Sequence, residues 1–268
     1  MPDGTTPLLL REDSDIGVTR LTLNRPESRN SLSFAMMGGL IDALRDVAAT
    51  SSVRVVVLAA AGPVFCAGHD LREITAHRAD PDAGRGFFDT AMRRCADLMQ
   101  AIVALPQPVI AEVQGIATAA GCQLVATCDL AVASEAARFC TPGVDIGLFC
   151  STPAVALSRA VAAKPAMEML LTGEMIAAEE ARRIGLINRV AVSDALRGAT
   201  MELAAKIAAR SAYAVRAGKA AFHRQRGLPL DQAYAHCAAV MTDNLMAVDA
   251  EEGIGAFLGK RRPVWQDR

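Results

Sequence analysis

Two turns made of small residues give this chain its clearest sign of chemistry. The first is Ala67-Gly68-His69, and the second is Ala119-Ala120-Gly121, which opens onto an apolar helix. A helix N-terminus offers backbone N–H groups without partners and the positive end of a dipole. Two such N–H groups aimed at one carbonyl oxygen stabilise an enolate or a tetrahedral oxyanion. The alternative is that each segment is only a tight turn packed against a neighbour.

The side chains beside these turns leave the acid–base chemistry open. His69 either protonates an enolate or holds a carboxylate, or it faces solvent and contributes only its N–H. Gln123 can orient a water molecule but cannot take its proton, because an amide does not titrate. On a strand, Asp145 would face the same side as Gly143, which makes it a candidate displaced acid. The alternative for Asp145 is a solvated or paired carboxylate.

The hydrophobic pattern predicts the elements that position these turns. Alternation over residues 8–23 predicts a hairpin, and Ser33 caps a helix predicted by the spacing that follows it. The pattern predicts strands over 53–58, 109–113, 130–133 and 187–190, with helices over 34–49, 87–103 and 120–128. Strands that alternate with helices imply a parallel sheet, so the fold class is α/β.

Connections and domains follow from the same pattern. Residues 60–68 are predicted to be a loop of small residues, and 76–86 a mobile polar loop. Beyond residue 164 nearly everything is predicted to be helical. Residues 1–195 are therefore expected to form the core with the site, and 196–268 a C-terminal helical region.

Composition excludes several classes of function. The chain has 268 residues, of which 52% are hydrophobic, and its net charge is −1. That charge gives no general attraction to nucleic acid or to an anionic membrane surface. No apolar run is long enough to span a membrane, and the first residues do not resemble a secretory signal. We therefore expect a cytoplasmic protein with neither nucleic acid nor membrane as a partner.

The cysteines and glycines argue against metals and nucleotide cofactors. The seven cysteines are odd in number and form no C-x-x-C pair, which favours reduced thiols and gives no spacing for zinc. Cys150 stands just before a predicted helix and is expected to be a packed, inert thiol rather than a nucleophile. No glycine-rich phosphate loop follows a strand, so neither ATP nor NAD is implied.

Six segments in order resemble one superfamily. They lie at residues 23–26, 65–70, 113–115, 121–124, 128–131 and 256–262. Together they resemble the crotonase (enoyl-CoA hydratase/isomerase) superfamily over nearly the whole chain. Within it, residues 117–126, 141–144 and 147–153 are most similar to the enoyl-CoA hydratase domain-containing protein 3 subgroup. The resemblance implies a spiral of β-β-α units with a helical C-terminal trimerisation region, assembled as a homotrimer or a dimer of trimers.

The same resemblance implies a site for an acyl-CoA thioester. The N–H groups of His69 and Ala120 would form the oxyanion hole. Coenzyme A enters as part of the substrate, so no separate cofactor and no metal are expected. The residues implied to hold coenzyme A are Arg25, Arg29, Asn30, His69, Asp70 and Leu71, with Phe257 and Lys260 closing the site, often from a neighbouring subunit.

Two glutamates that manage water and a proton in hydratases of this family would fall on positions 123 and 143. This chain has Gln123 and Gly143 there. Losing such acid–base help costs roughly 10²–10⁴ in rate for each role. The prediction is therefore a family member that acts on a CoA thioester through an oxyanion hole, with efficient hydration not expected. The alternatives are a malonyl-type acyl-CoA decarboxylase or thioesterase, and a catalytically silent acyl-CoA-binding protein.

Overall fold

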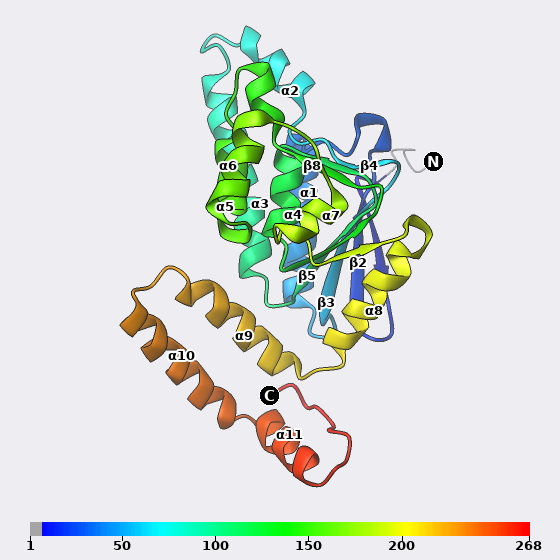
Figure 1. Cartoon of the computed structure of the whole chain (residues 1–268), viewed down its shortest axis with the longest axis vertical. Coiled ribbons are helices and arrows are strands. Elements are labelled where there is room, and N and C mark those ends of the chain that lie inside the picture. Colours follow the sequence, from blue (N-terminus) through cyan, green and yellow to red (C-terminus); the bar gives the residue numbers. More distant parts are fainter. Residues whose placement is uncertain (1–6) are drawn as a thin grey trace.

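The computed structural model describes residues 7–268 as an α/β fold with two sheets (Figure 1). The larger sheet has the order β1-β2-β3-β5-β7-β10, and only its β1–β2 pair is antiparallel. Its strands are β1 Leu9–Asp13, β2 Val18–Leu23, β3 Val55–Ala60, β5 Val109–Val113, β7 Leu130–Ser134 and β10 Arg189–Ala191. The smaller sheet consists of β4 Val64–Cys66, β6 Ile116–Thr118, β8 Arg138–Cys140 and β9 Ile176–Ala177.

The chain winds through repeated β-β-α units. Each unit adds one strand to the larger sheet and the next strand to the smaller sheet, and then forms helices. In the first, β3 and β4 precede α2 (Leu71–Ala76) and α3 (Arg85–Ala104); in the second, β5 and β6 precede α4 (Ala120–Thr127); in the third, β7 and β8 precede α5 (Ser151–Ala160). Helical crossovers are what parallel strands require, so the predicted α/β spiral is confirmed.

Helix α1 (Phe34–Ala49) shows how the sequence fixes a helix. The Ser33 hydroxyl accepts a hydrogen bond from the Met36 N–H at its start. Its buried side chains are Met36, Met37, Leu40, Leu44 and Val47, which recur at helical spacing. The same face packs against α3, and the predicted bounds of the helix are confirmed.

Two apolar clusters lie on the two faces of the larger sheet. The major cluster holds α1, α3 and α4 against the sheets. The minor cluster joins Val55, Val57 and Ile110 to α8 (Leu196–Ala208). Aliphatic side chains make up most of both clusters, in keeping with an aromatic content of only 4%, and the major cluster also includes the fully buried Phe65 and Phe139. The remaining helices of the core are α6 (Ala163–Thr172) and α7 (Ala178–Arg183), with short 3-10 helices at Pro26–Ser28, His77–Ala79, Pro142–Ile146 and Ser193–Ala195.

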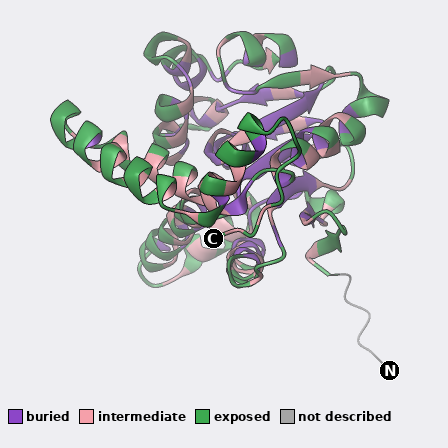
Figure 2. Ribbon diagram, turned by 90° about the horizontal axis from the view of Figure 1, so that it is seen from below, coloured by how far each residue is buried: buried purple, intermediate pink, exposed green. Residues whose placement is uncertain are grey.

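The last three helices form an arm that projects from the core (Figure 1). They are α9 (Ala212–Gln225), α10 (Leu230–Leu245) and α11 (Val248–Leu258). Most of the arm is exposed, as Figure 2 shows. The final residues fold back on it, because the buried Asp249 carboxylate accepts from the N–H groups of Gln266 and Asp267. The boundary predicted at residue 195 stays a prediction.

Two predicted loops contain regular structure. Residues 60–68 include strand β4, and residues 76–86 include a 3-10 helix and the first two residues of α3. Within the described chain, no helix combines the length and the apolar character needed to cross a membrane.

Candidate active site

The two small-residue turns lie against each other. Strands β4 and β6 pair in parallel, so their carboxyl ends reach the same edge of the smaller sheet. Gly68 follows β4 with a φ of 85°, where a Cβ would lie 2.9 Å from the Ala119 Cβ and 3.1 Å from the Ala120 nitrogen. The sequence prediction that both turns reach one sheet edge is therefore confirmed.

Backbone hydrogen bonds to neighbouring segments hold both turns in place. The Leu32 N–H donates to the Gly68 carbonyl at 2.7 Å, and the Ala119 N–H donates to the Cys140 carbonyl at 3.0 Å. Ala119 adopts φ 51° and ψ −120°, a conformation that non-glycine residues rarely occupy. Such local strain persists where the surrounding structure enforces it, and it is concentrated at functional sites.

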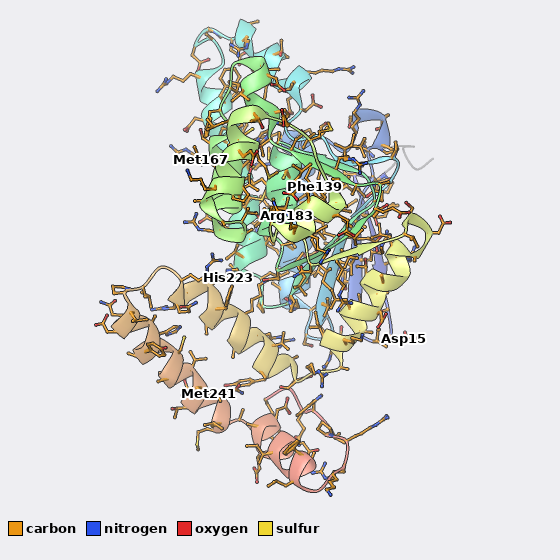
Figure 3. The ribbon with its side chains drawn as sticks, viewed as in Figure 1. Asp15, Phe139, Met167, Arg183, His223 and Met241 are labelled. Carbon is orange, nitrogen blue, oxygen red and sulfur yellow. The ribbon has the colours of Figure 1, made fainter. Side chains whose placement is uncertain are left out.

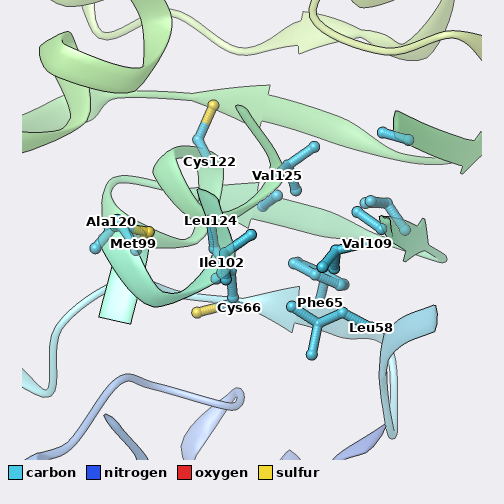
Figure 4. Close-up of a cluster of buried hydrophobic side chains, with 14 of the residues drawn as sticks. Leu58, Phe65, Cys66, Met99, Ile102, Val109, Ala120, Cys122, Leu124 and Val125 are labelled. Carbon is cyan, nitrogen blue, oxygen red and sulfur yellow. The ribbon is translucent and has the colours of Figure 1, made fainter. Parts of the chain in front are cut away.

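Two N–H groups at this edge have no internal acceptor. Within residues 7–268, neither the His69 N–H nor the Ala120 N–H donates to a carbonyl or a side chain. The Ala120 N–H belongs to the first turn of α4, where helix donors lack intrahelical partners. Figure 4 shows how Ala120 and Cys122 of α4 lie above Cys66 at the end of β4. The arrangement can receive an electron-rich oxygen from outside the chain.

Gln123 lies one helical turn from Ala120. Its side chain is only 4% exposed, and helix side chains tilt toward the N-terminus, here toward the turns. Its Oε1 accepts a hydrogen bond from the Cys95 Sγ of α3 at 3.8 Å, and its Nε2 has no partner in the described chain. Cys95 was not among the predicted site residues. Its helical spacing with Ala91, Leu98 and Met99 indicates a core-facing position but not the contact with Gln123.

His69 presents a neutral imidazole. Burial lowers the pKa of His69 below its usual value, although the nearby Leu32 carbonyl opposes this effect. Its Nε2 is buried without a hydrogen-bond partner among the described residues. The ring therefore contributes no positive charge near neutral pH, and its tautomer decides whether Nε2 donates or accepts.

Position 143 has no space for a longer side chain. A Cβ on Gly143 would lie 2.8 Å from the Cys150 Sγ and 2.8 Å from the Leu148 carbonyl oxygen. Burial raises the pKa of the Cys150 thiol. A hydrogen bond from the Gly143 N–H lowers this pKa, but its effect is smaller than that of burial. A raised pKa keeps Cys150 protonated, as expected of a packed thiol.

The condition that made Asp145 a candidate acid, an extended strand through positions 143–145, is not met. Residues Pro142–Ile146 form a 3-10 helix, and Asp145 is exposed. A 3-10 helix has three residues per turn, so positions 143 and 145 do not face the same side. The Asp145 carboxylate instead lies beside Gly173, where an added Cβ would be 3.3 Å from both of its oxygens. The geometry that made Asp145 a candidate acid is absent.

Comparison with known proteins identifies the family of this fold and site. The family model described as "Enoyl-CoA hydratase/isomerase" matches residues 13–268.

The chain belongs to the enoyl-CoA hydratase/isomerase family.

Three relatives illustrate the range of similarity within this family. Mouse "Enoyl-CoA hydratase domain-containing protein 3, mitochondrial" is 46% identical over 97% of this chain and 85% of that protein, which confirms the predicted subgroup resemblance. The solved structure of the Mycobacterium smegmatis enoyl-CoA hydratase is 52% identical, with a TM-score of 0.93 over 97% of this chain and 99% of that one. The Escherichia coli "2,3-dehydroadipyl-CoA hydratase" is 35% identical over 94% of this chain and 96% of that protein. The cytoplasmic location of this chain stays a prediction.

The segment expected to hold coenzyme A in this family member borders the first turn. The Ala67 N–H donates to the Arg29 carbonyl at 3.0 Å, which joins the two segments. Asn30 has a structural task, because its Nδ2 donates to the carbonyls of Ala61 and Val64 and its Oδ1 accepts from the Arg25 N–H. The side chain of Asn30 is thus fully engaged and the residue is completely buried, so its observed role is to hold the loop together.

Four of the remaining candidate coenzyme A residues lie at positions 25, 29, 70 and 71. Asp70 caps α2 by accepting from the N–H groups of Arg72 and Glu73, and Leu71 beside it is exposed. Arg25 donates to the carbonyls of Pro7 and Asn24. Arg29 is exposed, with φ 55°. Their role in holding coenzyme A stays a prediction.

Phe257 and Lys260 lie far from the turns of the same chain. Helix α11 and α2 stand at opposite ends of the molecule in Figure 1, and Phe257 is 83% exposed. The structure therefore does not bring these two residues to the site within one protomer. Their closure of a neighbouring subunit's site stays a prediction. The described residues contain no group of three or more His, Cys, Asp or Glu side chains that could hold a metal ion.

Proposed function

We propose that this protein binds an acyl-CoA thioester with its carbonyl oxygen between the His69 and Ala120 N–H groups, and polarises it without the carboxylates of a hydratase. The observation that carries the proposal is the pair of unpartnered N–H groups on adjoining turns. One donor of this kind contributes about 3–4 kcal/mol to stabilising an oxyanion. Membership of the enoyl-CoA hydratase/isomerase family supports the choice of ligand.

Hydration of an enoyl thioester needs a group that removes a proton from water and a group that returns one. Gln123 cannot titrate, and Gly143 has neither a side chain nor space for one. Each missing group is worth roughly 10²–10⁴ in rate. Polarisation of the thioester survives in this site, but proton transfer by the usual pair does not.

Restoring one carboxylate should therefore raise hydration. Gln123→Glu is expected to speed the hydration of crotonyl-CoA by about 10²-fold, the lower end of what one acid–base group contributes, because position 143 still supplies none. The measurement is the loss of absorbance of the conjugated double bond, alongside calorimetric binding of crotonyl-CoA to both proteins. Gln100→Glu makes the same change on the exposed side of α3 and is expected to leave the rate unaltered. Rapid hydration by the unmodified protein would contradict the proposal.

Decarboxylation of a malonyl-type thioester is the second candidate. Cleavage of the C2–C3 bond releases CO₂ and leaves the electron pair in an enolate, which two N–H donors stabilise without a base. The amide at Gln123 favours this reaction, since a carboxylate at that position would repel the acyl carboxylate. CO₂ release from malonyl-CoA and methylmalonyl-CoA tests it. Binding of these thioesters without turnover would instead favour a catalytically silent acyl-CoA-binding protein.

We also infer that the chain assembles as a homotrimer or a dimer of trimers. The arm exposes large apolar side chains, among them Leu230, Tyr234, Met246, Phe257 and Leu258. Exposed apolar surface of this kind marks interaction sites. The mass in solution, measured by light scattering, tests the inference, and a monomer at micromolar concentration would refute it.

A further inference from the structure

Helix α11 buries very little apolar surface within its own chain. Of its 11 residues, only Asp249 and Ala256 are buried. Its large apolar side chains Ile254, Phe257 and Leu258 are each at least 50% exposed. A helix in a folded protein normally gains most of its stability by burying an apolar face. Contacts of another kind therefore hold α11 in place.

Those contacts come from residues 261–268, which we call the return segment. It runs from α11 back to the start of α9 (Figure 1). The Asp249 carboxylate, in the first turn of α11, accepts from the Gln266 N–H at 2.6 Å and from the Asp267 N–H at 3.0 Å. The Asp249 N–H donates to the main-chain oxygen of Arg268 at 3.0 Å. The start of α11 is thus joined to the return segment through one carboxylate that is 1% exposed.

The return segment also binds the root of the arm. Asp267 accepts from the N–H of Ala212, the first residue of α9, at 2.8 Å, and its other carboxylate oxygen accepts from Arg54 Nη2. Arg54 directly precedes β3, and its Nη1 donates to the carbonyls of Ala208 and Arg210 at 2.7 and 2.8 Å. Asp267 therefore connects α11 to the core and to the connection between α8 and α9.

We propose that the return segment is a strap that fastens α11 to the root of the arm, so that α11 offers its exposed apolar side chains to a second copy of the chain in one fixed position. The second part of this statement rests on the assembly proposed above. The direct link from α10 to α11 is only residues 246–247, and Met246 is 82% exposed. That link is too short and too exposed to fix the direction of α11 by packing.

Asp249→Asn tests the strap with almost no change in shape. An amide has one acceptor oxygen where a carboxylate has two, so its NH₂ group would face either the Gln266 or the Asp267 N–H. Hydrogen–deuterium exchange of the α11 amides in the full chain is expected to become about 10- to 100-fold faster, the effect of losing one hydrogen bond to a buried charged group. Amides of β3 and β5 should exchange as before. Asp243→Asn makes the same change at an exposed position of α10 and should alter neither.

Light scattering tests the second part. Asp249→Asn is expected to raise the protein concentration needed for assembly by about tenfold or more, because only chains with α11 in place can bind a second copy. Asp243→Asn should assemble as the unmodified protein does. Unchanged assembly in Asp249→Asn, together with faster exchange in α11, overturns the second part and leaves the strap standing.

The exchange result decides the strap by itself. Exchange in α11 that is no faster in Asp249→Asn overturns it. Equal acceleration in β3 and β5 also overturns it, since the contacts would then support the whole fold. If Asp249→Asn does not fold, Asp267→Asn takes its place: this change keeps an oxygen for the Ala212 N–H and removes the charge that faces Arg54. An unmodified protein that stays monomeric overturns the proposed assembly, while faster exchange in α11 would still support the strap.

Discussion

Gly121→Ala is expected to lower the stability of the fold and to abolish binding of CoA thioesters. A Cβ at this position would lie 2.2 Å from the Cys66 carbonyl oxygen and 2.8 Å from both the Cys66 carbonyl carbon and Cβ. The obstacle is mostly backbone at the end of β4, so no side chain can rotate away. Overpacking of this kind costs about 1–3 kcal/mol or more. Helix α4 must shift away from β4, and that shift separates the Ala120 N–H from the His69 N–H.

The measurement pairs urea unfolding with calorimetric binding of crotonyl-CoA. Gly198→Ala is the matched control, because Gly198 lies on the exposed side of α8 with no atom within 4 Å of an added Cβ. There the same substitution should stabilise the protein by about 0.5–1 kcal/mol through helix propensity and leave binding intact. If Gly121→Ala binds the thioester as tightly as the unmodified protein, the two turns do not form the ligand site.

Long, strongly patterned elements could be predicted from the sequence. Helix Phe34–Ala49 and strand Val109–Val113 have the predicted bounds, since the helix has many apolar residues at helical spacing and the strand is a mostly apolar run that is buried throughout. The smaller sheet could not be predicted. Its strands β4, β6 and β8 have three residues each and β9 has two, which is too short for an alternating pattern to stand out. They exist because neighbouring turns of the spiral pair them.

The same distinction between local signals and long-range packing applies to the candidate site. The turns could be predicted because glycine and alanine mark them locally, and the order of the motifs carried the family resemblance. The partners of Gln123 and Gly143 could not, since the Cys95 and Cys150 thiols come from other elements and meet them only through packing. The strand geometry considered for Asp145 is absent for a local reason. Pro142 opens a 3-10 helix and Gly147, at φ 75°, ends it, which leaves no extended backbone in between.

The second large effect is expected at Lys219, where the arm joins the core. Lys219 lies on α9, and its Nζ donates to the Asp129 carboxylate at 2.7 Å and to the carbonyls of Ile102 and Gln107 at 3.0 Å each. Figure 3 shows His223 on the same helix at this junction, and its Nε2 is 3.3 Å from Asp129. The Lys219 side chain is 7% exposed and that of Asp129 is 17% exposed.

Lys219→Met should therefore lower the free energy of unfolding by about 3 kcal/mol, because it leaves a partly buried carboxylate and two backbone carbonyls without their cationic partner. Lys206→Met is the matched control: Lys206 pairs with Glu202 on α8, but the two side chains are 59% and 64% exposed. Exposed pairs contribute at most about 1 kcal/mol, so urea unfolding should separate the two variants clearly. Equal losses of unfolding free energy in the two variants would mean that the contacts of Lys219 do not fasten the arm to the core. A selective loss would mean that the contacts of Lys219 fasten the arm to the core.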